Sequence, residues 1–282
     1  MVKFLVAFLI ATQSIWGSAY TLEPGALFTG LATEYMTFQN ITDSTRKKIT
    51  LNNRIHLYRV AAFLEYGIID DLDAGFVLPF DSYQGSKNAT HALTGIGDFE
   101  LHAKYRILRE EKDYPFTLAL QLRGSVPIAK FQPSELAGPG DAVPDATTML
   151  LASRYFSISS WLFYLNAGSG YYYRSGSLNS SLVFSLEGGA IITDELSVFV
   201  PVQSFYALGG IDLESKEFKN IVASTSKTPF DQLSETYIKM GLGVSYQLTN
   251  SLNLTFVYSN TLLAVNSSLQ QHFSLYAGNQ FF

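Results

Sequence analysis

Residues 97–107 read GDFELHAKYRI, and two chemically different sets of side chains alternate along this stretch. The odd-numbered set, from Phe99 to Ile107, carries no charge, whereas every member of the even-numbered set can ionise. Because side chains in a β-strand alternate between two faces, the stretch predicts a strand with one apolar and one ionisable face. The ionisable face would carry Asp98, Glu100, His102, Lys104 and Arg106.

The composition limits the class of protein. The chain has 282 residues, of which 47% are hydrophobic and 14% aromatic, a balance that argues against intrinsic disorder. Charged residues reach only 15%, below the roughly 25% of average proteins. The formal net charge of -5 gives no basic footprint for nucleic acid, so we expect no nucleic-acid partner. The absence of cysteine excludes disulfides, thiolate zinc sites and a cysteine nucleophile.

The N-terminus has the order of features found in a secretory signal. Lys3 precedes an apolar run over residues 4–11, and small residues follow at 17–19. This order predicts a signal peptide over 1–19, cut after Ala19, and leaves 20–282 as one domain. The apolar run is too short to span a bilayer as a helix, which takes about 20 residues. A buried N-terminal strand or helix is the alternative interpretation.

The two-residue alternation recurs along the rest of the chain, without a convincing helical period. Counting such segments predicts an all-β chain of about twelve strands. Their expected ranges are 27–41, 49–67, 72–82, 97–108, 114–126, 147–156, 161–173, 181–192, 196–208, 235–248, 251–264 and 271–282.

The connections between these strands alternate between short and long. The longest are 127–146 and 209–234, and short turns such as 69–71 and 249–250 fall between the long ones. This alternation is typical of an up-and-down antiparallel barrel in the bacterial outer membrane, with both chain ends on the short-turn side. A Greek-key sandwich would not give it.

A closed barrel also accounts for the opening stretch. In lipid every backbone polar group needs a partner, and a closed barrel provides one for each. The apolar face would then contact the lipid of the outer membrane, and the ionisable face would line a watery interior. Aromatic residues near strand ends, such as Tyr66 and Trp161, fit the girdles at the two interfaces. Aromatic packing in a soluble sandwich is the alternative.

Two features fit the strand pattern poorly. Pro79 and Pro201 fall inside predicted strands, where proline removes a ladder hydrogen bond, so we expect them at bulges or strand ends. The segment 49–67 changes phase, because Leu57 shares a parity with Arg59 and Glu65. A β-bulge would explain the change, but the pattern does not locate it.

Several short motifs share one pattern. They are GIGD at 95–98 with Leu101 and KYR at 104–106, DDL at 70–72 leading to VLP at 77–79, and TDEL at 193–196 leading to VFVP at 198–201. These motifs resemble a family of outer-membrane transporters named after the meta pathway of phenol degradation. That family repeats a turn with an acidic residue and Leu, followed by an apolar strand that reaches Pro.

The resemblance implies a barrel channel for small molecules, with aromatic or hydrophobic solutes among the candidates. It would make the two awkward prolines a family feature. The terminal Phe282 is the usual C-terminal mark of bacterial outer-membrane barrels. It implies that the last strand is recognised by the barrel-assembly machinery.

We expect the function to lie in the interior of the barrel. Opposed acids and bases across a narrow lumen would orient polar solutes and filter ions. The alternative is a salt-bridge network that fills the barrel, since twelve strands fall between filled eight-stranded and open sixteen-stranded barrels. The predicted pore-lining residues are Asp98, Glu100, His102, Lys104, Arg106, Arg123, Arg154, Glu187, Glu235 and Lys239.

Two other functions remain open. An inert barrel could bind a surface through its long extracellular loops. His272 and Ser274 share a strand face, as in some outer-membrane lipid hydrolases, but the orienting third group is not apparent in the sequence. We therefore expect no enzyme, no cofactor and no metal site, and we expect membrane lipid, lipopolysaccharide and small solutes as partners.

Overall fold

The computed structural model describes residues 18–84, 93–110, 114–128, 144–174, 180–216 and 233–281. These residues form one sheet of thirteen strands. In chain order they are β1 (Leu27–Thr42), β2 (Lys48–Ile69), β3 (Leu72–Gln84), β4 (Leu93–Ile96), β5 (Phe99–Leu108), β6 (Thr117–Val126), β7 (Asp145–Ile158), β8 (Trp161–Arg174), β9 (Ser181–Ile191), β10 (Leu196–Ala207), β11 (Thr236–Gln247), β12 (Leu252–Val265) and β13 (Gln271–Phe281).

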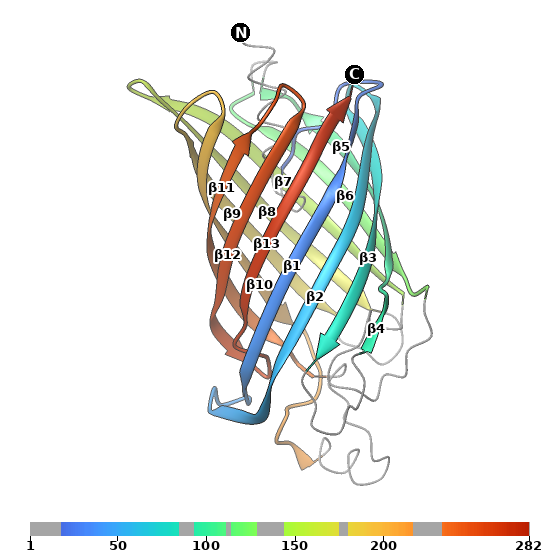
Figure 1. Cartoon of the computed structure of the whole chain (residues 1–282), viewed down its shortest axis with the longest axis vertical. Coiled ribbons are helices and arrows are strands. Elements are labelled where there is room, and N and C mark those ends of the chain that lie inside the picture. The colour runs from blue at the N-terminus through green and yellow to red at the C-terminus, as the bar shows by residue number, and fades with distance from the viewer. Residues whose placement is uncertain are drawn as a thin grey trace.

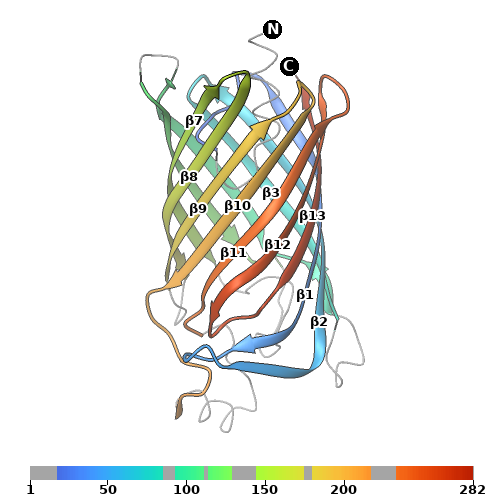
Figure 2. The same cartoon turned by 90° about the vertical axis from the view of Figure 1, so that its left-hand side faces the viewer.

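Neighbouring strands pair antiparallel around a closed barrel (Figures 1 and 2). The last strand, β13, pairs with β1, and β2 pairs with β3, so the described sheet has no free end apart from the short β4. Both β4 and β5 pair with β3, at successive stretches, and therefore occupy one position in the barrel. The prediction of a twelve-stranded up-and-down barrel is confirmed.

The predicted strand 97–108 is shorter than expected, because the chain leaves the sheet at Gly97 and Asp98. This break explains Pro79 on the neighbouring strand. β3 pairs with β5 as far as Val77 and with β4 from Phe80, so the proline lies where its neighbour is interrupted. A missing N–H costs least at such a position.

Pro201 lies at a second interruption. β10 pairs with β11 up to Phe199 and again from Val202, so the ladder skips the proline on that side. The β1–β2 register shifts between Phe38 and Asn40, where residues 51–54 face the single residue Gln39. This irregularity lies before Ile55, and the pairing runs without a shift from Ile55 to Tyr66, so no bulge separates Leu57 from Arg59 and Glu65. The expected bulge is therefore not the cause of their shared parity. The cause is that the inner face of β2 is itself partly apolar, with Leu57 and Phe63 buried on it.

The outer surface of the barrel is apolar, whereas the inner surface combines apolar with polar and charged side chains. On β5, Leu101 and Tyr105 are 52% and 51% exposed, whereas Lys104 between them is 8% exposed. Exposed aromatic and aliphatic side chains continue over β6 to β13. An outward apolar band of this kind is the surface that an outer-membrane barrel presents to lipid. No helix in the described part of the chain is long and apolar enough to cross a membrane.

The two ends of the barrel differ. Leu27 at the start of β1 pairs with both Tyr66 and Phe281, so β1 begins and β13 ends at the same end of the barrel. The short turns 70–71, 159–160 and 248–251 lie at this short-turn end (Figure 1). The strand ends that lead into the long connections lie at the opposite end, called here the long-loop end. Most of 127–146 and 209–234, the segment 1–17 and Phe282 lie outside the described residues.

Candidate functional site in the barrel lumen

The interior of the barrel contains a cavity of about 360 Å³. Its wall combines two kinds of side chain. Phe28, Phe63 and Phe199 give it an apolar part, and hydroxyl, amide and charged groups give it a polar part. The charged residues that line it are Glu34, Arg59, Glu187 and Lys239. A cavity with an apolar wall and a few polar groups is the usual form of a small-molecule site.

The phenylalanine rings lie over glycines of neighbouring strands. Phe28 covers Gly278 and Phe199 covers Gly243, at positions where a Cβ on the glycine would overlap the ring. Phe63 covers Gly30 in the same way, and its ring centroid lies 5.4 Å from that of Phe28. Because each ring occupies the space of a missing side chain, it lies against the wall. The rings thus give the wall of the lumen an aromatic surface and leave its centre open.

The charges around the cavity are unequally paired. The Arg59 guanidinium donates to both carboxylate oxygens of Asp81, at 2.7 and 3.0 Å. His272 Nε2 lies 3.4 Å from Glu34 Oε2. The Lys239 ammonium has no ion pair within the part of the chain that the structure describes, and lies 4.9 Å from the centroid of the Tyr237 ring. Lys239 is therefore the cation of the cavity wall that is most available to bind a mobile anion.

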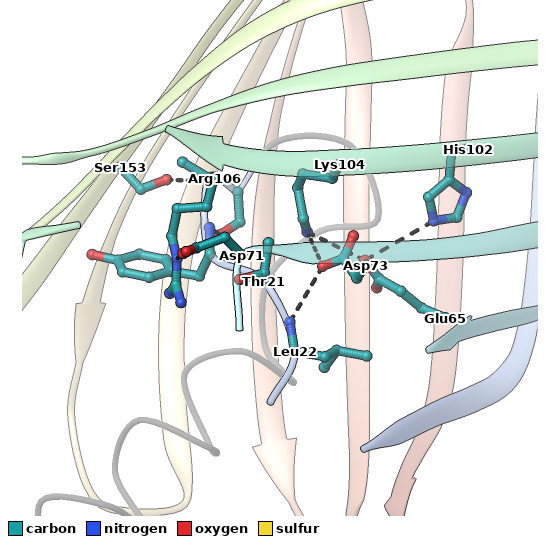
Figure 3. Close-up of polar contacts among 12 residues, drawn as sticks. Thr21, Leu22, Glu65, Asp71, Asp73, His102, Lys104, Arg106 and Ser153 are labelled. Carbon is teal, nitrogen blue, oxygen red and sulfur yellow. Dashed lines mark hydrogen bonds and ion pairs between the residues drawn. The ribbon is translucent and has the colours of Figure 1, made fainter. Parts of the chain in front are cut away.

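A second charged cluster lies nearer the short-turn end (Figure 3). The Lys104 ammonium contacts Glu65 at 3.2 Å and Asp73 at 3.3 Å, and Asp73 is fully buried. His102 Nε2 lies 4.0 Å from the same Glu65 carboxylate. Such buried charges persist only because each is paired, since an unpaired one would carry a large desolvation cost.

The turn between β2 and β3 holds a third cluster. Arg106 Nε lies 3.1 Å from Asp71 Oδ1, and Arg109 Nε donates to the same oxygen at 2.6 Å. These hydrogen bonds, from Arg109 first and Arg106 next, hold the pKa of Asp71 below its usual range. The cluster fixes the short turn against β5 and the segment that follows it.

The structure places most predicted site residues on the inner wall, but not in one array. Glu100 pairs with Arg123 at 3.4 Å, and Glu187 accepts a hydrogen bond from Asn166 at 3.3 Å. Asp98 lies between β4 and β5, and Glu235 is exposed just before β11. Of the ten predicted residues, only Glu187 and Lys239 line the cavity.

Arg154 lies where it was not expected. The inner face of β7 carries Met149, Leu151 and Ser153, so Arg154 points outward, and it is exposed. Its position close to the turn 159–160 explains how a cation is tolerated there. Near a strand end, the long side chain can keep its charged head at the interface while its methylene groups cover apolar surface.

Sequence reasoning missed the charges that face the cavity from the first strands. Glu34 lies on the inner face of β1 with Ala32, and Arg59 lies on that of β2 with Ala61 and Phe63. Because these inner faces are largely apolar, alternation could not tell them from lipid-facing ones. The shared parity of Arg59 and Glu65 was the available signal.

His272 and Ser274 meet, but not as a hydrolytic pair. Ser274 Oγ lies 3.2 Å from His272 Nε2, and Glu34 Oε2 lies 3.4 Å from that same nitrogen. A relay needs the acid on one ring nitrogen and the nucleophile on the other. Here both groups compete for one nitrogen, so the arrangement cannot activate the hydroxyl as a triad does. Among the described residues no group of acidic and histidine side chains is arranged to hold a metal ion.

A closed twelve-stranded barrel with an apolar exterior and an inner cavity of mixed polarity defines a class, the bacterial outer-membrane β-barrel. The solved structures agree with this class. The fold is similar to that of an outer membrane channel from Pseudomonas putida F1, with a TM-score of 0.72 and 15% identity over 95% of this chain and 100% of that one.

The fold is also similar to the translocator domain of autotransporter NalP from Neisseria meningitidis, with a TM-score of 0.50 and 12% identity over 99% of this chain and 94% of that one. At such identities the likeness concerns the fold. No family model matches the sequence, and no curated protein matches it.

Proposed function

We propose that the protein is an outer-membrane channel for the passive, energy-independent passage of small solutes through a narrow lumen of mixed charge. The observation that carries the proposal is the cavity inside a closed barrel, walled by three phenylalanines and four charged residues. Its polar groups suit hydrated solutes, and the flat rings suit solutes with an aromatic or hydrophobic part. The similar fold of a protein whose name is outer membrane channel supports the same role.

Several finer expectations belong to this proposal. The resemblance of the motifs at 70–79, 95–106 and 193–201 supports a relation to the transporters named after the meta pathway of phenol degradation. A signal peptide cut after Ala19 would deliver the chain to the periplasm. Recognition of the last strand by the assembly machinery and contact with lipopolysaccharide would follow from insertion in the outer membrane. The short-turn end would then face the periplasm.

The first test is electrical. Purified protein in a planar bilayer should give small stepwise currents, because ions would pass the same lumen as solutes. Absence of current at every voltage and salt concentration would contradict the proposal and favour a filled barrel.

Ion selectivity tests whether ions pass through the cavity when they cross the barrel. Lys239→Glu should shift the reversal potential toward cation selectivity, because it exchanges the one wall cation without an ion pair in the described structure for an anion. Lys104 is a poorer choice, since its reversal would strand the Glu65 and Asp73 carboxylates. Arg154→Glu is the matched control. It makes the same charge change on the outer surface and should leave selectivity as it is.

A further inference from the structure

A row of four aromatic side chains crosses the outer surface of the barrel. Tyr58, Tyr35, Phe273 and Tyr258 are direct neighbours in the pairing of β2, β1, β13 and β12. Successive ring centroids lie 5.0, 6.1 and 4.7 Å apart. Tyr58 and Phe273 are 45% and 36% exposed. The row faces away from the lumen, because the residues beside it on these strands line the cavity.

The phenol groups of this aromatic row have polar partners on the side of the long-loop end. The Tyr35 hydroxyl lies 2.8 Å from His56 Nδ1, and the Asn260 amide donates to the Tyr258 hydroxyl at 2.7 Å. His56 precedes Tyr58 on β2 and Asn260 follows Tyr258 on β12, so both partners lie nearer the long-loop end. Rings with one polar end collect where acyl chains meet headgroups. The aromatic row therefore marks the level at which the headgroups of that leaflet begin.

The hairpin of β1 and β2 continues past the aromatic row and bends along the long-loop rim toward β12 (Figure 2). The amide of Thr42 donates to the carbonyl of Ser267 at 2.9 Å, and the amide of Leu269 donates to the carbonyl of Asn40 at 2.9 Å. The end of the hairpin thus lies on the connection between β12 and β13. The turn 43–47 is therefore at the rim on the same side of the barrel as the aromatic row.

This turn is held in shape by its own acidic residue. Asp43 Oδ1 accepts hydrogen bonds from the amides of Thr45 and Lys47, each at 2.8 Å. The amide of Arg46, which has a left-handed φ of 67°, donates to the Asp43 carbonyl at 3.1 Å. Three successive cations, Arg46, Lys47 and Lys48, are exposed on this defined backbone.

The charge of these three cations is largely uncompensated. None of them forms an ion pair with another residue that the structure describes. The Asp43 carboxylate is 2% exposed and serves the turn itself. Asp212, on a neighbouring connection, accepts hydrogen bonds from an amide and a hydroxyl beside it. Clustered Lys and Arg at a membrane surface attract anionic headgroups, and both side chains bind phosphate through charge-assisted hydrogen bonds.

We infer that the turn 43–48 and the aromatic row form a docking site for lipopolysaccharide, in which the three cations bind the phosphates of the lipid headgroup and the rings contact its acyl chains. The inference rests on the proposed function, because the long-loop end must face the leaflet that holds this lipid. A lipid-borne phosphate fits better than a free anion, since the rings offer an apolar surface directly below the cations and outside the lumen.

Binding of purified lipopolysaccharide to the wild-type protein in detergent is the first test. Lipopolysaccharide stripped of its phosphates should bind at least about tenfold more weakly, because the cations lose their partners. Inorganic phosphate in large excess should not displace the intact lipid, because it lacks the contacts with the rings. Equal affinity for the two lipids would overturn the inference, and so would displacement by inorganic phosphate.

The second test removes the three cations. The triple variant Arg46→Asn/Lys47→Gln/Lys48→Gln should bind intact lipopolysaccharide at least about tenfold more weakly than the wild type. Asparagine is chosen at position 46 because it adopts a positive φ more readily than most residues. Arg154→Gln is the control, since it removes an exposed cation near the short-turn end and should bind as the wild type does. Unchanged affinity of the triple variant would overturn the inference. Circular dichroism shows whether the variant holds the barrel, and the lipid pair on the wild type gives an independent answer if it does not.

Thiol labelling separates this inference from the proposed function. The chain has no cysteine, so single cysteines can be introduced without background. On intact cells a membrane-impermeant reagent should label Ser44→Cys, whereas Asp194→Cys at the short-turn end should react only after the outer membrane is permeabilised. The reverse pattern would overturn both the orientation and the lipid site. Absence of current from the wild type would overturn the channel and leave the lipid site standing, because the site lies on the outer surface.

Discussion

At the scale of single residues, the wall of the cavity depends on glycines that make room for rings. Gly243→Ala should destabilise the barrel by about 1–3 kcal/mol, the usual cost of overpacking, because the new Cβ overlaps the buried Phe199 ring. Gly188→Ala is the matched control. Its Cβ would meet only Leu165, at 3.8 Å. Thermal unfolding in detergent measures both variants, and equal midpoints would show that the ring moves aside freely.

Sequence reasoning at this scale gives a clear assignment where one strand face is wholly ionisable and an ambiguous one where a face is mixed. The even-numbered residues of β5 could be assigned inward because the opposite face carries no charge. Their partners Glu65, Asp73 and Asp71 lie on β2, β3 and the turn between them. The alternation of residues along one strand does not predict which residues of another strand they pair with. Arg154 was assigned inward by parity, whereas the buried side chains of Met149, Leu151 and Ser153 put it on the outer face of β7.

At the scale of elements, the turn between β2 and β3 is fastened by its ion pairs. Asp71 faces Arg106 and Arg109, with Asp70 beside it, and its pKa is lowered from 3.8. The unfolded chain takes up the proton near the ordinary value, so this stabilisation is fully present above about pH 4. It is lost as the pH falls through the lower pKa of the folded state.

Asp71→Asn should therefore lower the midpoint of thermal unfolding at neutral pH and make that midpoint depend less on pH below pH 4. The loss of stability should be about 0.2–1 kcal/mol, the size usual for a partly exposed ion pair. Asp194→Asn, in the exposed turn 192–195, is the control and should change neither quantity. The measurement is a series of thermal melts by circular dichroism across acidic pH. An unchanged acid slope in Asp71→Asn would mean that the turn contributes no linked stability.

The elements themselves followed from alternation and turn length, but their interruptions did not. The break at Gly97 and Asp98 lies opposite Pro79, and the gap in β10–β11 pairing lies at Pro201. Each interruption is defined by the pairing of two strands. The sequence of one strand alone therefore shows only a proline where a strand residue with an N–H is expected. The shift at Phe38 and Asn40 is of the same kind, because it is defined by the partner residues Ile55 and Thr50.

At the scale of the whole molecule, the apolar exterior should make substitution costs depend on depth in the bilayer. Leu242 lies near the middle of β11 and Leu248 just beyond its short-turn end, and they are 54% and 50% exposed. Arginine at an outward midplane position costs about 2–4 kcal/mol in a bilayer, falling to about 0–1 kcal/mol near the interface. We therefore expect Leu242→Arg to destabilise the barrel in lipid vesicles far more than Leu248→Arg does.

Reversible denaturant unfolding in vesicles gives both free energies, and the same pair in detergent micelles provides the contrast. A soluble sandwich, with no bilayer to cross, would show no such gradient along β11. Equal costs at the two positions would therefore contradict insertion of the barrel in a bilayer. They would also contradict the interpretation of the cavity as a path between two compartments.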